Sequence, residues 1–145
     1  MKLIIAAAAF AALGVGAAFA QADVIKQRQE AMKATGAATG LAGKMLKGEE
    51  KFDLAKVQAG LRTYVDVAKK SPALFPDNSK TGGDTAALPA VWEKKAEFDG
   101  KFAAWGKESE AALAAIKDEA TFKATMPNVM KNCGGCHETF RAKKS

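Results

Sequence analysis

The sequence predicts an all-α fold, an antiparallel four-helix bundle with up-down-up-down connections, and two observations support it. Apolar residues recur at intervals of three and four over four segments, the spacing of an amphipathic helix. Stretches with Gly, Pro and Asp separate these segments, and no alternating run typical of a β-hairpin lies between them. The 145 residues suffice for one such domain.

Residues 1–20 have the features of a secretory signal peptide. A lysine precedes an uninterrupted small and apolar run, and Ala18-Phe19-Ala20 offers a cleavage site before Gln21. A membrane anchor is the alternative, but the run is near the lower limit of length for a span and is rich in Ala and Gly rather than Leu. We therefore expect a mature domain, residues 21–145, in the periplasm and without a membrane segment.

The first two helices are expected at about 23–47 and 53–70. Asp23 and Asp53 are suitable N-cap residues, and the apolar stripes follow them at helical spacing. The stripe of the first helix contains many Gly and Ala residues. Small side chains there allow a neighbouring helix or a flat cofactor to approach the backbone.

Residues 71–89 are expected to form a long connection rather than a helix. They contain three of the four prolines and the Gly82-Gly83 pair. Leu74 and Phe75 are the apolar residues that we expect to anchor this connection on the core.

The last two helices are expected at about 90–117 and 119–142. Pro89 suits the first turn of the third helix, and Asp118 is a suitable cap for the fourth. Pro127 is expected to kink the fourth helix or to delay its start, because proline lacks an N–H and clashes with the preceding turn.

The motif with the most specific chemistry is Cys133-Gly134-Gly135-Cys136-His137, which contains both cysteines and the only histidine of the chain. C-x-x-C-H is the attachment signature of a c-type haem. The two thiols form thioethers with the porphyrin vinyl groups, and His137 supplies the proximal axial nitrogen. Helical spacing places these three side chains and Phe140 on one side of the last helix, so that the haem is expected near one end of the bundle.

Other uses of this motif fit the sequence less well. A thioredoxin-like redox pair normally opens a helix after a strand, and no strand is predicted here. Two cysteines and one histidine leave a structural zinc site one ligand short. A haem-free C-x-x-C disulfide remains the alternative that an exported protein permits. The net charge is +6, but the sequence contains no arginine-rich patch with interleaved aromatics, which argues against nucleic-acid binding.

A methionine is a natural candidate for the second axial ligand, and it must come from a helix other than that of His137. Met126 and Met130 share the helix of His137, which leaves Met32 and Met45. Thirteen residues of helix separate these two by about 20 Å and rotate them by roughly 220°, so both cannot face one haem. Met32 lies on the buried stripe near the start of the first helix, although a core methionine filling a gap is the alternative.

The chain resembles the class II cytochromes c, the cytochrome c prime family. Beside the Cys133–Arg141 segment, the resemblance rests on Arg28-Gln29, on Phe75-Pro76-Asp77 and on Trp92. Members with a methionine four positions after the arginine, where this chain has Met32, form the low-spin cytochrome c-556 type.

The resemblance implies further roles for two arginines and a function. Arg28 is expected near a haem propionate, and Arg141 near the imidazole or a propionate. With His137 and Met32 as iron ligands, the protein would carry single electrons. The alternative is a five-coordinate, high-spin haem that binds NO or CO, with Met32 not ligating. An enzyme such as a peroxidase is disfavoured, because no second histidine is present to act as a base.

The expected partners follow from the same interpretation. A redox partner with an acidic patch would dock at the thioether edge of the haem. The basic residues that we expect around this edge are Lys123, Lys131, Arg141, Lys143 and Lys144. The resemblance also leaves room for a homodimer through the first two helices.

Overall fold

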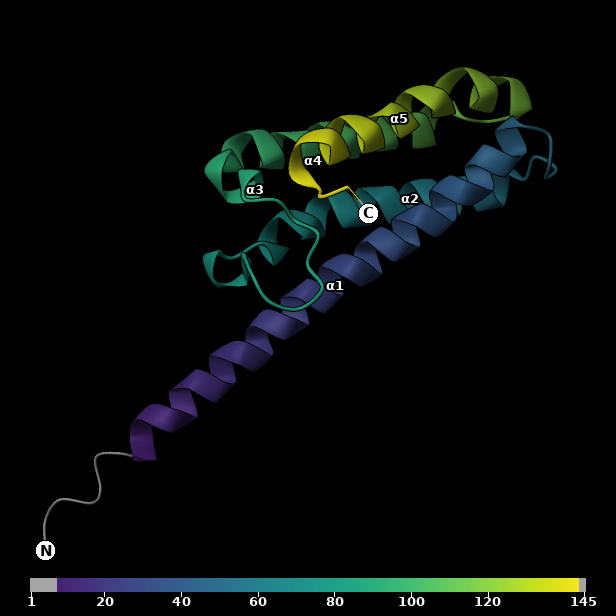
Figure 1. The fold of residues 1–145 in the computed structure, drawn as a ribbon. Helices are drawn as coiled ribbons and strands as arrows, with labels where there is room; N and C mark the ends of the chain where they lie inside the picture. The colour runs from purple at the N-terminus through teal and green to yellow at the C-terminus, as the bar shows by residue number, and fades with distance from the viewer. Residues whose placement is uncertain (1–7, 144–145) are drawn as a thin grey trace, which may run out of the picture.

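The computed structural model describes the backbone of residues 8–143 and the side chains of residues 21–143. The helices are α1 (Ala8–Leu46), α2 (Leu54–Lys70), α3 (Ala90–Glu93), α4 (Lys95–Ala115) and α5 (Glu119–Phe140), with 3-10 turns at Ser71–Leu74 and Asp77–Ser79. α1 packs along α2, α2 along α4 and α4 along α5 (Figure 1). This arrangement confirms the predicted four-helix bundle.

α1 contains the predicted first helix and extends upstream of its expected start near residue 23, to Ala8. Asp23 lies inside α1, where its carboxylate accepts a hydrogen bond from Gln27 Nε2 at 3.0 Å instead of capping the helix. Residues 8–22 are rich in alanine, the strongest helix former, and contain no proline that would end the helix. Cleavage after residue 20 stays a prediction, and residues 1–7 of the predicted signal peptide lie outside the described residues.

The predicted caps of the second and fourth helices are confirmed. The Asp53 carboxylate accepts a hydrogen bond from the backbone N–H of Lys56 at 3.0 Å. Asp118 and Thr121 form a capping box, with the carboxylate accepting from Thr121 N at 2.8 Å. Because this box fixes the start of α5, Pro127 does not delay the helix and is exposed within it.

The predicted third helix is interrupted at Lys94, whose backbone leaves the helical region with φ −117° and ψ 43°. The turn separates α3 from α4, and Trp92 of α3 packs on the connection between α2 and α3, which we call the crossover (residues 71–89). The Nε1 of Trp92 donates to the carbonyls of Phe75 and Pro76 at 3.1 and 3.2 Å. The expected core contact of Phe75 is confirmed, since its ring lies 4.7 Å from that of Phe98.

The end of α5 is joined to the crossover by two backbone hydrogen bonds. Leu88 N donates to Phe140 O at 3.0 Å, and Ala142 N donates to Ala86 O at 2.8 Å. These bonds flank an isolated antiparallel bridge between Ala87 and Arg141. They explain why α5 ends at Phe140, two residues earlier than predicted, because the following residues are extended.

The bundle has one tightly packed end, which we call the closed end. It contains the α1–α2 and α4–α5 turns, seen together at the upper right of Figure 1. Met45, Ile116, Phe122 and Met126 are at most 3% exposed there, and the rings of Phe52 and Phe122 lie 5.5 Å apart. Burial of these side chains contributes to the hydrophobic stabilisation of the fold.

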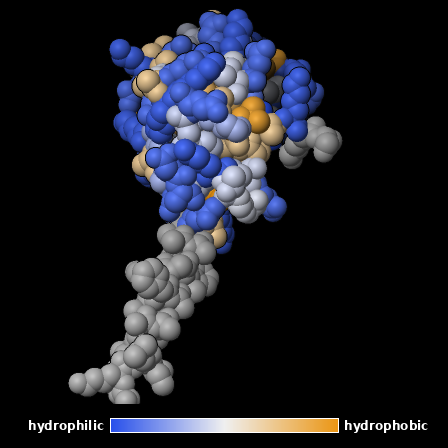
Figure 2. All heavy atoms as spheres, turned by 60° about the vertical axis from the view of Figure 1, so that its left-hand side comes forward, coloured by the Kyte–Doolittle hydropathy of each residue, from blue (hydrophilic) through white to orange (hydrophobic). Residues whose placement is uncertain are grey.

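The surface is mostly hydrophilic on the face shown in Figure 2. Within the described part of the chain, no helix combines the length and the apolar character that a membrane span requires.

Candidate haem site

A cavity of about 520 Å³ lies at the end of the bundle opposite the closed end. This volume is within the roughly 300–1,000 Å³ typical of cofactor sites. Three elements supply most of the walls: α1, α5 and the crossover that connects α2 to α3. The lining residues are Ile25, Arg28, Gln29, Met32, Lys33, Ser71, Phe75, Asp84, Thr85, Ala86, Ala87, Val91, Phe98, Phe102, Cys136, His137, Phe140 and Arg141.

The wall from α5 carries the chemistry of the C-x-x-C-H motif. Cys136, His137 and Arg141 line the cavity, whereas Cys133, one turn earlier on α5, is not among the lining residues. Both cysteines are half-buried and free, so the structure has no disulfide between them. No cluster of three or more His, Cys, Asp or Glu side chains suited to a metal ion occurs within residues 21–143.

The partly buried setting favours the neutral forms of the thiols and of the imidazole. Burial raises the pKa of Cys133 and of Cys136, and for Cys136 the nearby Lys101 partly offsets that rise. Burial lowers the pKa of His137, and the positive charge of Arg141 lowers it further. A neutral imidazole retains the nitrogen lone pair that a metal ligand needs.

The opposite wall comes from α1 and contains Met32. Met45, the other methionine of α1 that the sequence offers as a candidate axial ligand, is 3% exposed in the core of the closed end. Met126 is also buried there, and Met130 packs against the core outside the cavity lining. Among the methionines of residues 21–143, Met32 alone therefore shares the cavity with His137.

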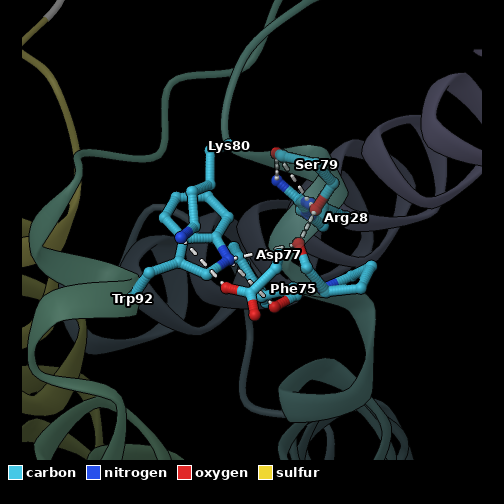
Figure 3. A network of polar contacts seen from close by, with 7 residues as sticks. Arg28, Phe75, Asp77, Ser79, Lys80 and Trp92 are labelled. Carbon is cyan, nitrogen blue, oxygen red and sulfur yellow. Dashed lines mark hydrogen bonds and ion pairs between the residues drawn. The ribbon is translucent and has the colours of Figure 1, made fainter.

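The third wall is the crossover, and Arg28 is bound to it. The side chain of Arg28 lines the cavity, but its Nε donates to the carbonyl of Leu74 at 2.5 Å and its Nη2 to that of Ser79 at 3.2 Å. Figure 3 shows the guanidinium lying against Ser79 and close to Phe75. The pairing of Arg28 with a propionate stays a prediction.

Several residues of the site were not found by sequence reasoning. Ser71 lines the cavity from the 3-10 turn that follows α2, and Thr85, Ala86 and Ala87 line it from irregular backbone, where no periodicity indicates which side chains face inward. Lys101, on α4, lies close enough to Cys136 to affect its pKa, and only the packing of α4 on α5 brings these residues together.

The positions of the predicted basic residues differ from one another. Lys123 lies near the start of α5 and pairs with Glu119 at 2.6 Å. Lys131 and Lys143 are exposed closer to the C-x-x-C-H motif, and Lys144 lies outside the described residues.

The donor groups and the shape of the cavity fit a covalent haem. Val91, Phe98, Phe102 and Phe140 supply apolar walls, and two free thiols and one neutral imidazole lie on a single helix face at the wall of the cavity or beside it. Ser71 Oγ is buried at the cavity wall without a hydrogen-bond partner among the described residues, so a bound group with a polar atom would satisfy it.

Comparison with known proteins agrees with this chemistry. The family model described as cytochrome C′ matches residues 23–141. The chain is 55% identical to cytochrome c′ of Rhodopseudomonas palustris over 146 residues, with all of both chains covered. It is 36% identical to cytochrome c-556 of the same organism over 148 residues, covering 99% of each.

The solved structure of cytochrome c′ from Rhodopseudomonas palustris superimposes with a TM-score of 0.82. The match covers 85% of this chain and 98% of that one, at 55% identity. The chain thus belongs to the cytochrome c′ family of class II cytochromes c, whose cofactor is one covalently bound haem c.

Proposed function

We propose that Cys133 and Cys136 bind the haem and that His137 is its proximal ligand. Each thiol would add across one vinyl group: a sulfur–carbon bond forms and the thiol hydrogen goes to the neighbouring vinyl carbon, so no oxidant is consumed. The turn of helix between Cys133 and His137 allows one element to hold the porphyrin edge and to direct the imidazole. The bound haem would supply a metal centre for reversible one-electron chemistry.

The function that the geometry supports best is one-electron transfer with Met32 as the second axial ligand. The observation that carries this proposal is that Met32 lines the cavity of His137 from a different helix. A thioether ligand raises the reduction potential of haem iron. Phe98, Phe102 and Phe140 would surround the haem and exclude water.

Gas binding is the second candidate, and the relatives favour it over the first. The relative with 55% identity is named cytochrome c′, whereas the identity to the protein named cytochrome c-556 is 36%. In this alternative Met32 does not bind the iron, and NO or CO would bind at the sixth coordination position.

The visible spectra of the ferric and ferrous protein distinguish these candidates. A low-spin spectrum with a far-red sulfur-to-iron band, lost in Met32→Ala but kept in Met130→Ala, would establish Met32 ligation. Met130 is a matched control because it is a partly buried methionine outside the cavity lining. A high-spin spectrum that changes at once with CO would contradict Met32 ligation and support gas binding. A colourless protein would contradict the haem attachment itself.

For electron transfer we propose docking of an acidic partner on the surface around Cys136. Lys101, Lys131 and Lys143 are exposed and carry no ion pair within the described residues. Attraction between such a surface and a negatively charged partner weakens as salt screens it. Reduction by an anionic reagent should therefore slow with rising ionic strength, and a constant rate would contradict this docking surface.

The small-residue face of the first helix leaves room for a homodimer. We also propose that the mature protein acts in the periplasm after signal cleavage.

A further inference from the structure

Arg28 is a buried cation whose charge is satisfied by the crossover rather than by a carboxylate. Its side chain is 7% exposed, and burial lowers its pKa. Within residues 21–143 it forms no ion pair with Asp or Glu. Buried charges require hydrogen bonds or a partner of opposite charge, so the contacts of this guanidinium account for its position.

Backbone and hydroxyl oxygens of the crossover accept the hydrogen bonds of Arg28. Nε donates to Leu74 O at 2.5 Å, and Nη2 donates to both oxygens of Ser79, a residue with no exposed surface. Nη1 makes longer contacts of 3.4 Å to Ser79 O and 3.5 Å to Thr85 Oγ1. One side chain thus binds the crossover at three places spread over residues 74–85.

Aromatic rings hold the guanidinium in the same place. Its central carbon lies 4.2 Å from the centroid of Phe75 and 5.7 Å from that of Trp92. Trp92 in turn donates to the carbonyls of Phe75 and Pro76, so the three side chains form one connected unit (Figure 3). A planar guanidinium can stack on rings and donate in a fork at the same time, which a lysine ammonium cannot do.

The segment held by Arg28 is a wall of the cavity and is tied to the helix of His137. Phe75, Asp84 and Thr85 line the cavity from this segment. Just beyond it, the backbone hydrogen bonds of Ala86 and Leu88 join the end of α5. Arg28 itself lies one turn before Met32 on α1. The crossover therefore connects the wall that carries Met32 to the wall that carries His137, and Arg28 secures its attachment to α1.

We propose that Arg28 is a positioning residue that clamps the crossover to α1 and limits the entry of small neutral ligands, such as CO, into the cavity. This inference rests on the proposed haem site, and it differs from the propionate role that the family resemblance implies. A propionate partner needs the positive charge of Arg28, whereas a clamp needs its fork geometry. Lysine keeps the charge and loses the fork, so Arg28→Lys separates the two roles.

The experiment compares the holoprotein with Arg28→Lys, Arg28→Met and Arg62→Lys. Arg62 is a matched control, because it is an exposed arginine of α2 that donates only to Gln58, at 3.5 Å. Amide hydrogen exchange is measured for peptides covering 74–89 and, as an internal reference, 54–70. The association rate of CO with the reduced protein is measured at low CO concentration.

Both Arg28 variants should exchange about tenfold faster in 74–89, the effect of losing one hydrogen bond to a charged donor. Their CO association should accelerate, and Arg62→Lys should change neither quantity. Normal exchange in Arg28→Lys, with faster exchange only in Arg28→Met, would show that charge matters and would overturn the clamp. Equal acceleration in 54–70 would mean general destabilisation and would also overturn it. Faster exchange with unchanged CO association would overturn the role in ligand entry.

A failure of the clamp and a failure of the proposed function give different experimental outcomes. Ligation by Met32 makes the CO rate level off at high concentration in every variant, and a free sixth position keeps the rate proportional to CO. A colourless protein would refute the haem site, while the exchange measurement would still test the clamp.

Discussion

Two methionines of the same helix show how differently the two ends of this bundle are built. Met45 is 3% exposed and packs beside Val57 and Met126 in the closed end. Met32, thirteen residues earlier, is partly exposed on the wall of a cavity of about 520 Å³. The same residue type thus fills core volume at one end and lines a cavity at the other.

The difference separates an end built from close packing from an end that contains the candidate site. The closed end is stabilised by tight apolar packing and by the side-chain caps of Asp53 and Asp118. The cavity end contains backbone that is neither helix nor strand, partly buried thiols and a buried arginine. Such groups cost folding free energy unless a bound group or a specific contact satisfies them.

The largest effect should come from shortening the two methionines. Met45→Ala should lower the free energy of unfolding by about 2–5 kcal/mol, the usual cost of a cavity in a packed core. Its visible spectrum should match that of the wild type. Met32→Ala should cost less stability, because Met32 already borders open space, but it should alter the spectrum. Urea unfolding and visible spectra of both holoproteins test this, and equal stability losses would contradict the comparison.

A smaller effect is expected where the two ends meet, at Tyr64. Its hydroxyl shares a hydrogen bond of 2.8 Å with Thr39 Oγ1 and joins α2 to α1. Tyr64→Phe should lower the free energy of unfolding by about 1 kcal/mol, because Thr39 Oγ1 still donates to Thr35 O at 2.8 Å. Thr63→Ala, which removes an exposed hydroxyl of the same helix, is the control. Similar losses in both variants would show that the partly buried bond between Tyr64 and Thr39 has no special role.

The smallest effect should be a dependence on pH at the cap of the closed end. Hydrogen bonds from Thr121, chiefly from its backbone N–H, lower the pKa of Asp118 from its ordinary 3.8. A lowered carboxyl pKa contributes stability that is complete above the unfolded-state value and is lost as pH falls through the folded-state value. Asp118→Asn should remove this part of the loss below about pH 4.

Thermal unfolding between neutral pH and pH 2 measures the effect of Asp118. The exposed Asp66 of α2 provides the control variant, Asp66→Asn. The cap is not the source of the pH dependence if both variants lose stability in acid as steeply as the wild type.

Sequence reasoning found the parts of this molecule that repeat or that carry a motif. Helical spacing located the four long helices, and C-x-x-C-H located the α5 wall of the cavity. The rotation between Met32 and Met45 along one helix separated the methionine of the cavity from that of the core. Each of these predictions depends only on positions within a single helix, and the roles of the motif and of Met32 at the haem stay predictions.

The remaining features depend on contacts between distant segments. The partners of Arg28 are mainly backbone carbonyls of the crossover. Because every residue has a backbone carbonyl, the residue types do not indicate which carbonyls bind Arg28. The break at Lys94 accompanies the docking of Trp92 on the same crossover. α1 extends upstream to Ala8 because the leader is rich in alanine, which is typical of a signal peptide and also favours a helix.

The bridge between Ala87 and Arg141 has a consequence for the order of folding. It closes a chain segment of more than fifty residues, and long segments pay more entropy on closure than short ones. The α1–α2 hairpin joins neighbours in the chain and can form as soon as both helices exist. The two walls of the cavity, by contrast, cannot be joined before the last turn of α5 has formed. We therefore expect α1 and α2 to associate early, and the two walls of the cavity to meet in one of the final steps.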